Sequence, residues 1–277
     1  MCRWLAYSGS PLKLSSLLTR PNHSLIDQSR HAIQNVESLN GDGFGVGWYG
    51  DDPTPGVYRD THPAWNDENF QHLSEHIQSG LFLAHVRAST GTAVQNTNCH
   101  PFAFENWLFQ HNGSVPEFHT LKRQLLFNVD PELFPFIQGS TDSEVLFFLA
   151  LSFGLRDDPP AALARMIGHV ERVRKAAGIE APLFFSACMT DGRRLWAVRY
   201  SSHHQSRTLY HSSHMRALHD LDGTYGALPE DAIIVVSEPL DDLTRNWEEV
   251  PESSLLTVEA GSASVTAFSP EFQSASQ

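Results

Sequence analysis

The stretch Asn40-Gly41-Asp42-Gly43-Phe44-Gly45-Val46-Gly47-Trp48-Tyr49 restricts the possible folds more than any other part of this chain. A glycine-rich loop that cradles phosphate groups is followed directly by a helix, and no helical pattern opens here. Instead, large apolar residues alternate with Gly45 and Gly47, which is the period of a β-strand. A strand with glycines along one side has a bare face, so we expect another backbone or a ligand to approach it closely.

Alternation and capping signals elsewhere predict further strands and helices. In the apolar run from Trp4 to Tyr7, Leu5 and Tyr7 face one way, and Trp4 and Ala6 face the other. Thr141 and Glu144 have the spacing of a capping box in front of an apolar helix. The polar stretch from Asn22 to Asn40 has no periodic pattern and predicts a loop.

The order of these patterns favours a layered fold. After the predicted helix from Ala161 to Ala177, with Gly178 as its C-cap, most of the remaining chain alternates as strands do. Strands, then helices, then strands again predict helices packed outside two sheets. No interdomain linker is evident, so we expect a single domain over residues 1–268 and a polar tail over 269–277.

Composition and charge exclude several classes of protein. No apolar run is long enough to cross a bilayer, and the polar N-terminus has no signal-peptide core, so we expect neither membrane insertion nor export. The three cysteines form no disulfide framework, which favours a cytoplasmic location. A formal net charge of -13 argues against a nucleic-acid partner.

Cys2 follows the initiator methionine directly. If Met1 is removed, one residue carries both a thiol, with an ordinary pKa of about 8.5, and an α-amine, with an ordinary pKa of about 7.7–8.0. The amine is then able to take a proton from its own sulfur near neutral pH, as in N-terminal nucleophile enzymes. The alternative is an ordinary residue at a frayed terminus.

Polar residues at the ends of other predicted elements complement such a nucleophile. Arg87, with Thr90 at the same strand end, suits a carboxylate through its guanidinium. Asp142 suits an ammonium group, and the Asn112 side chain with the Gly113 N–H suits an oxyanion hole. A carboxylate and an ammonium together are the head of an α-amino acid, whose side-chain carbonyl the thiol would attack.

Each of these residues also has a simpler interpretation. Arg87 could form a surface ion pair, Asn112-Gly113 could be a plain turn, and Asp142 could only support the first turn of its helix. The five histidines His203, His204, His211, His214 and His219 could hold a metal, but they lack ligand-type spacing, so the sequence favours a loop and no metal site.

Six motifs, in order, resemble the class II glutamine amidotransferase domain. They are Met1-Cys2-Arg3, Asn40-Gly41-Asp42-Gly43, His85-Val86-Arg87-Ala88-Ser89-Thr90, Asn98-Cys99-His100-Pro101-Phe102, His111-Asn112-Gly113 and Gly139-Ser140-Thr141-Asp142-Ser143-Glu144. The resemblance implies an α+β fold, a four-layer αββα sandwich of two mostly antiparallel sheets typical of N-terminal nucleophile hydrolases. It is strongest to the stand-alone branch that acts on γ-glutamyl compounds in glutathione degradation and ergothioneine synthesis.

The resemblance also implies the roles of individual residues. Cys2 would be the nucleophile and, through its amine, the base. Asn112 and Gly113 would form the oxyanion hole, while Arg87, Thr90 and Asp142 would bind the substrate. No cofactor and no metal are implied.

The implied activity is a cysteine-dependent amidohydrolase that cleaves the γ-glutamyl amide bond of glutamine, or of a γ-glutamyl peptide such as glutathione, through a thioester. One alternative is a non-catalytic γ-glutamyl-binding subunit of a larger complex. Another is a glutaminase subunit that supplies ammonia to a separate synthase. The implied partners are a small γ-glutamyl substrate and a possible peptidase-like or synthase subunit. Synthase-linked members carry Trp-Ala-Thr-His after the arginine, whereas this chain has Ala88-Ser89-Thr90-Gly91, so its substrate loop is expected to differ.

Overall fold

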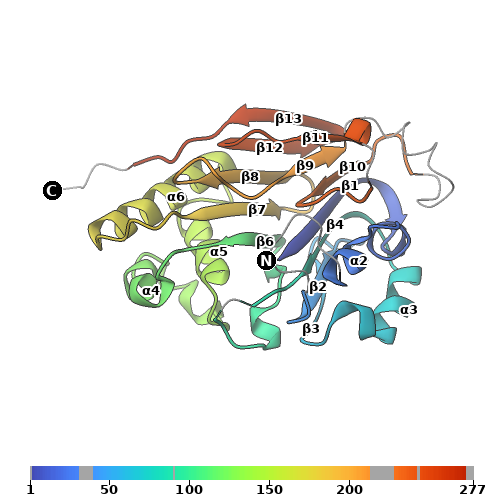
Figure 1. Ribbon diagram of the computed structural model, residues 1–277, viewed down its shortest axis with the longest axis horizontal. Coiled ribbons are helices and arrows are strands. Elements are labelled where there is room, and N and C mark those ends of the chain that lie inside the picture. Colours follow the sequence, from blue (N-terminus) through green and yellow to red (C-terminus); the bar gives the residue numbers. More distant parts are fainter. Residues whose placement is uncertain (1, 31–39, 90, 213–227, 242–243, 273–277) are drawn as a thin grey trace.

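Two antiparallel β-sheets stacked face to face make up the centre of the computed structural model (Figure 1). The structure describes residues 2–30, 40–89, 91–212, 228–241 and 244–272. The first sheet has the strand order β11-β9-β10-β1-β4-β2-β3, and the second has the order β13-β12-β8-β7-β6-β5. All the strand pairs have antiparallel registers. The predicted two-sheet architecture is therefore confirmed.

The bounds of the elements are as follows. The first sheet contains β1 (Arg3–Lys13), β2 (Phe44–Trp48), β3 (Gly56–Asp60), β4 (Gln78–Val86), β9 (Tyr210–Ser212), β10 (Ile233–Val236) and β11 (Trp247–Glu249). The second contains β5 (Phe102–Phe104), β6 (Trp107–Ser114), β7 (Phe184–Thr190), β8 (Leu195–Ser201), β12 (Ser254–Glu259) and β13 (Ser262–Ala267). The α-helices are α1 (Ser15–Leu18), α2 (Leu25–Arg30), α3 (Glu68–His76), α4 (Phe118–Leu126), α5 (Asp142–Ser152) and α6 (Pro159–Ala176). Short 3₁₀ turns are η1 (Ala64–Asn66), η2 (Asn96–Asn98), η3 (Phe134–Phe136) and η4 (Thr244–Asn246).

Helices cover both outer faces, which makes four layers (Figure 1). Apolar side chains of α4, α5 and α6 pack on the outer face of the second sheet, and those of α1, α2 and α3 pack on the first. A third cluster, which includes Trp4, Leu83 and Leu108, fills the space between the sheets. No helix within the described ranges is both long and apolar enough to cross a membrane.

The side chains of β1 alternate between two of these layers. Leu5 and Tyr7 belong to the cluster under α1–α3, whereas Trp4 and Ala6 belong to the cluster between the sheets. This is the alternation that the sequence predicts, and both faces of β1 are buried from Arg3 to Ser8 because the cluster under α1–α3 covers one face and the second sheet covers the other. Because successive side chains of a strand point to opposite faces, this alternation also sets the direction of the Cys2 side chain.

The bare face of β2 lies against the second sheet, as predicted from its glycines. A Cβ atom at Gly45 would collide with the carbonyl oxygen of His100, and one at Gly47 would lie 2.8 Å from the Leu108 side chain. Only glycine lets the loop before β5 approach β2 this closely.

One helix was not expected. Residues Leu25–Arg30 form α2, whereas the sequence predicts loop there. The Ser24 carbonyl accepts from Gln28 N at 2.8 Å, and the Ser24 hydroxyl accepts from Asp27 N at 3.2 Å. Ser24 is therefore an N-cap, and the pair Ser24 and Asp27 is the local signal that could have revealed the helix.

Candidate active site

Strand parity brings the predicted site residues to one end of the space between the sheets. Cys2 shares the parity of Trp4 on β1, so it faces the second sheet. Arg87 follows β4 and shares the parity of Leu83 and His85, which also face inward. On β6, Gln110 reaches across to donate to the Leu5 carbonyl at 3.0 Å, and Asn112 lies two residues further on the same face.

The Cys2 side chain is half-buried, and its Sγ lies 3.6 Å from the Ala88 carbonyl oxygen. Burial raises the pKa of the Cys2 thiol above its ordinary value. The charge of Arg87 opposes this rise, and the charge of Asp142 adds to it. Both charges are thus close enough to act on the sulfur. Because the thiol stays protonated near neutral pH, it needs a base before it can act as a nucleophile.

Arg87 is buried just after the end of β4, where its main chain is hydrogen-bonded to Gly43 and Asp42, the residues just before β2. Its guanidinium donates to oxygen atoms only: Nη1 to the Asp42 carbonyl at 3.2 Å, and Nη2 to Thr92 Oγ1 at 2.6 Å and the Ala93 carbonyl at 3.3 Å. Nη2 also lies 3.2 Å from Ser89 Oγ. Among the described residues, none with a negative charge pairs with it.

Two buried histidines, His85 and His100, are neutral near pH 7. His85 and His100 stack at 4.1 Å between ring centroids, and both are buried. Burial lowers the pKa of His85 to about 3 and lowers that of His100 well below its ordinary value. Arg87 therefore contributes a permanent positive charge beside these neutral rings.

Asn112 and Gly113 lie near the C-terminal end of β6. Asn112 is buried, and within the described part of the chain its side-chain amide makes no hydrogen bond. A Cβ atom at Gly113 would collide with the Phe184 carbonyl oxygen and the His111 ring, so a side chain has no room there. An amide without a partner, next to a bare backbone, fits the donor pair of the predicted oxyanion hole.

Asp142 is the first residue of α5. Its Oδ2 accepts from Val115 N at 2.8 Å, and its Oδ1 accepts from Ser143 N at 2.8 Å. The predicted cap is present, because the Thr141 hydroxyl accepts from Glu144 N at 3.2 Å. The Glu144 carboxylate reaches back to Gln138 N and Gly139 N, not to the Thr141 N–H of a standard capping box.

A pocket of about 600 Å³ opens beside these groups. Gly113 and Asp142 line it together with Thr92, Ala93 and Lys122. Asn98 joins two of its walls, since Asn98 Nδ2 donates to the Ala93 carbonyl at 2.8 Å and Asn98 Oδ1 accepts from Ser140 N at 2.8 Å. The pocket is large enough for a small molecule of drug-like or amino-acid size.

The structure thus gathers Cys2, Arg87, Asn112, Gly113 and Asp142, while Thr90 lies outside the described residues. Sequence reasoning gave no role to Asp42, whose carboxylate accepts from Ser89 N at 2.7 Å, or to Asn98. Both lie inside the family-like motifs, and that was the only available signal. Sequence reasoning also missed the contacts of Arg3 with Glu238 and with the Cys2 carbonyl.

No metal-binding group of three or more suitable side chains occurs in the ranges that the structure covers. Of the histidine-rich stretch, His203 and His204 are exposed and His211 is buried on β9. His214 and His219 lie outside the described residues.

Known proteins similar to this chain point in one direction. The sequence profile described as glutamine amidotransferases class-II matches residues 28–277. The chain is 36% identical over 291 residues to the probable glutamine amidotransferase DUG3 of Saccharomyces cerevisiae, covering 93% of this chain and 82% of the yeast protein. It is 26% identical over 271 residues to the gamma-glutamyl-hercynylcysteine sulfoxide hydrolase of Mycolicibacterium smegmatis, covering 96% of this chain and 99% of that protein.

Solved structures agree. A glutamine aminotransferase class-II domain protein from Silicibacter pomeroyi matches with a TM-score of 0.75 and 37% identity, covering 98% of this chain and all of that one (100%). The glutamine phosphoribosylpyrophosphate amidotransferase of Bacillus subtilis matches with a TM-score of 0.63 and 18% identity, over 97% of this chain and 49% of that protein. The second likeness concerns the fold alone.

Proposed function

This chain belongs to the class II glutamine amidotransferase family, and from that premise we propose that it hydrolyses the γ-glutamyl amide bond of glutamine or of a γ-glutamyl peptide such as glutathione. The observation that supports this most directly is electrostatic. A positive charge at Arg87 and a negative charge at Asp142 both act on the Cys2 sulfur, in opposite directions. A nucleophile that senses both charges suits a substrate head that carries one charge of each sign.

The proposed reaction begins after removal of Met1. The α-amine of Cys2 takes the thiol proton, and the thiolate attacks the δ-carbonyl carbon of the γ-glutamyl group. The Asn112 amide and the Gly113 N–H stabilise the oxyanion. The C–N bond breaks, the amine leaves with the proton from the Cys2 ammonium, and a thioester remains. Water then attacks the thioester, which releases glutamate and restores the thiol.

Arg87 binds the α-carboxylate in this proposal. Its guanidinium donates to the neutral oxygens of Thr92 and Ala93, and these two residues line the pocket. A carboxylate accepts stronger, charge-assisted hydrogen bonds than hydroxyl or carbonyl oxygens do. The substrate therefore displaces these loop contacts when it binds, and Asp142 receives the α-ammonium group.

Hydrolysis is favoured over transfer of ammonia. The relative from Mycolicibacterium smegmatis, which this chain matches over nearly its whole length, is named as a hydrolase. Delivery of ammonia to a separate synthase subunit, or assembly with a peptidase-like subunit, would need a partner chain. The experiment below separates hydrolysis from simple ligand binding.

The test is glutamate release from glutamine and from glutathione by wild type, Cys2→Ala and Cys188→Ala. We expect release by wild type and none above background by Cys2→Ala. Cys188→Ala is the matched control, because Cys188 is a buried cysteine between the sheets, so its loss should leave release intact. Intact-mass spectrometry should find Met1 absent from active protein. Binding of both compounds without any release would sink the hydrolase proposal in favour of a binding subunit.

A further inference from the structure

The main chain of Cys2 has little to hold it. The paired register of β1 with β4 starts at Arg3 opposite Val86, so Cys2 stands before the ladder. Within the described chain, no main-chain hydrogen bond joins Cys2 to a neighbouring strand. Its carbonyl oxygen accepts one hydrogen bond, from Arg3 Nη1 at 3.1 Å. Chain ends fray unless they are tied down, and the proposed chemistry needs the amine of this residue at a fixed place.

Arg3 is itself held by a buried carboxylate. Its side chain leaves β1 on the face opposite to the Cys2 side chain, and its Nε and Nη2 lie 2.7 Å and 2.6 Å from Glu238 Oε2. Both side chains are almost fully buried. Two N–H groups on one carboxylate oxygen leave the third arm of the guanidinium, Nη1, directed at the Cys2 carbonyl.

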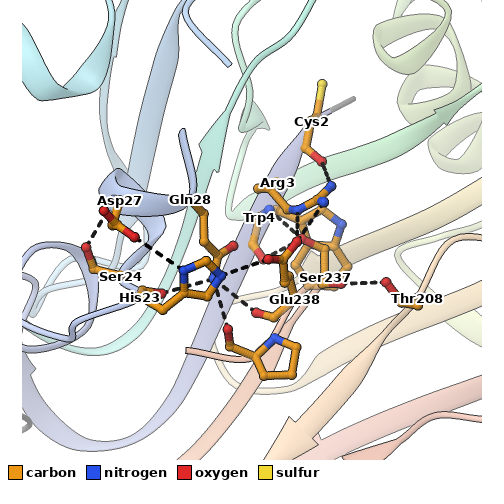
Figure 2. Close-up of polar contacts among 11 residues, drawn as sticks. Cys2, Arg3, Trp4, His23, Ser24, Asp27, Gln28, Thr208, Ser237 and Glu238 are labelled. Atoms are coloured by element: carbon orange, nitrogen blue, oxygen red, sulfur yellow. Dashed lines mark hydrogen bonds and ion pairs between the residues drawn. The ribbon is translucent and has the colours of Figure 1, made fainter. Parts of the chain in front are cut away.

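Glu238 is fixed from two further sides (Figure 2). Its Oε1 lies 2.7 Å from His23 Nε2, and His23 Nδ1 lies 3.3 Å from Asp27 Oδ2 on α2. Gln28 Nε2 donates to the Glu238 carbonyl at 3.2 Å. A network of Arg3, Glu238, His23, Asp27 and Gln28, here called the Arg3 network, thus links α2 to the first residue of the proposed active enzyme.

The strand beside β1 supports the same arrangement. Ser237 N donates to the Trp4 carbonyl at 3.1 Å, and Trp4 N donates to Ser237 Oγ at 3.0 Å, so the chain after β10 runs alongside the start of β1. In Figure 2 the Cys2 sulfur points away from Arg3 and Glu238, while the Cys2 carbonyl points toward Arg3. The network therefore contacts the backbone of Cys2 and leaves the thiol open to the site.

We propose that the Arg3 network is a positioning device for the nucleophile: Arg3 holds the Cys2 carbonyl, and Glu238 with His23 holds Arg3. The inference rests on the proposed function, in which the Cys2 amine is the base. Fixing the carbonyl fixes the Cα, and so limits where the amine and the thiol can move. A planar guanidinium suits this role, because its arms point in set directions and can hold two partners at once.

The decisive variant is Arg3→Lys. Lysine keeps a positive charge near Glu238 but lacks the forked geometry needed to reach the Cys2 carbonyl as well. We expect kcat for glutamate release to fall roughly ten- to a hundredfold, as misplacement of reacting groups does. KM should change by less than about threefold, because the network lines no part of the pocket. The matched control is Arg174→Lys, in a buried arginine–glutamate pair on α6 whose Nη1 donates to the carbonyls of Ile179 and Ala181 and not to the Cys2 main chain.

A second measurement reports the position of Cys2 without substrate. The rate at which iodoacetamide alkylates Cys2 is followed by peptide mapping, which separates Cys2 from the buried Cys99 and Cys188. If Arg3→Lys frees the chain end, burial of the thiol is lost and alkylation at neutral pH should accelerate. Arg174→Lys should leave that rate unchanged.

The outcomes are separable. A fall in kcat and faster alkylation in Arg3→Lys alone support the positioning role. Equal losses of melting temperature in both variants, with wild-type kcat and wild-type alkylation, would show that the Arg3 network only stabilises the fold. If wild type releases no glutamate, the proposed function fails, and the alkylation rates still decide whether Arg3 holds Cys2.

Discussion

Two buried arginine–glutamate pairs in this molecule are nearly identical in local geometry. The Nη2–Oε2 distance is 2.6 Å for Arg3 and Glu238 and 2.7 Å for Arg174 and Glu171. In both pairs the arginine side chain is 5% exposed and the glutamate 2%. Burial and distance therefore cannot distinguish the two pairs, and only their remaining contacts can.

Those contacts serve different purposes. Arg174 Nη1 donates to the carbonyls of Ile179 and Ala181, just after the end of α6. Glu171 Oε1 accepts from the hydroxyls of Tyr200 and Ser202 at the end of β8. This pair fastens a helix to a sheet. The Arg3 pair joins residues 235 positions apart, and Arg3 Nη1 donates to the carbonyl of Cys2.

The comparison shows that the role of a buried ion pair cannot be inferred from the distance and burial of its two side chains. Removal of both charges from such a pair is often nearly neutral for stability, whereas removal of one leaves an uncompensated buried charge. What a pair contributes beyond that depends on the group that its spare hydrogen bonds hold in place. For Arg174 the held group is a helix end, and for Arg3 it is the proposed nucleophile.

The largest effect should come from breaking the structural pair. Glu171→Ala leaves Arg174 buried without its carboxylate and two hydroxyls without their acceptor, so we expect a loss of about 3–5 kcal/mol in the free energy of unfolding. Urea denaturation measures it. At a temperature where the variant is folded, kcat should equal that of wild type. A fall in kcat as large as that of Arg3→Lys would erase the distinction between the two pairs.

The reverse case, activity lost with stability kept, is expected for Asn112→Ala. Its side-chain amide has no partner within the described chain to leave unpaired, but loss of one oxyanion donor typically lowers kcat roughly a hundred- to a thousandfold. Steady-state kinetics and a melting curve on the same sample test both halves. The exposed amide Asn128→Ala is the control. An Asn112→Ala enzyme with normal kcat would remove Asn112 from the oxyanion hole.

Much of the fold follows from local sequence patterns. The alternation in β1, the bare face of β2 and the Thr141 cap of α5 are all present, because strand parity and helix caps depend on neighbouring residues. β3 has no such local pattern. It is an edge strand of intermediate burial that, in the described part of the chain, pairs with β2, so the signal for it lies in that pairing.

The site, like the fold, has features that local sequence predicts and features that it does not. Cys2, Arg87, Asn112 and Asp142 stand at the ends of predicted elements, and the family-like motifs mark them. The contact between Arg3 and Glu238 depends on the register of β1 with β10, which no local pattern encodes. The present contacts of Arg87 with Thr92 and Ala93 depend on the path of a loop, and sequence alone did not indicate that a substrate would have to displace them.

The smallest expected effect is a difference between the two pairs in how their contribution to stability depends on pH. Burial alone would lower the pKa of His23, but its contacts with Glu238 and Asp27 outweigh burial, and the pKa is raised above its ordinary value of 6.5. Protonated His23 therefore stabilises the fold fully below about pH 6.5, and this contribution falls as the pH rises through the raised pKa. The Glu171 cluster behaves differently: burial raises the pKa of Glu171, yet the hydrogen bonds from Ser202, Arg174 and Tyr200 outweigh it, so the pKa is lowered and the carboxylate stays charged throughout this range.

The opposite directions of these two pKa shifts can be tested with a matched pair of variants, His23→Gln and Glu171→Gln. The difference in unfolding free energy between wild type and His23→Gln should shrink between about pH 6 and pH 9, while the difference for Glu171→Gln should stay constant, because only the first cluster contains a group that titrates there. Some difference for His23→Gln should persist at high pH, since neutral His23 still donates to Glu238. Urea denaturation at several pH values measures both. If the His23→Gln difference did not vary with pH, His23 would hold Glu238 only as a neutral hydrogen-bond donor, and no charge on His23 would contribute to the Arg3 network.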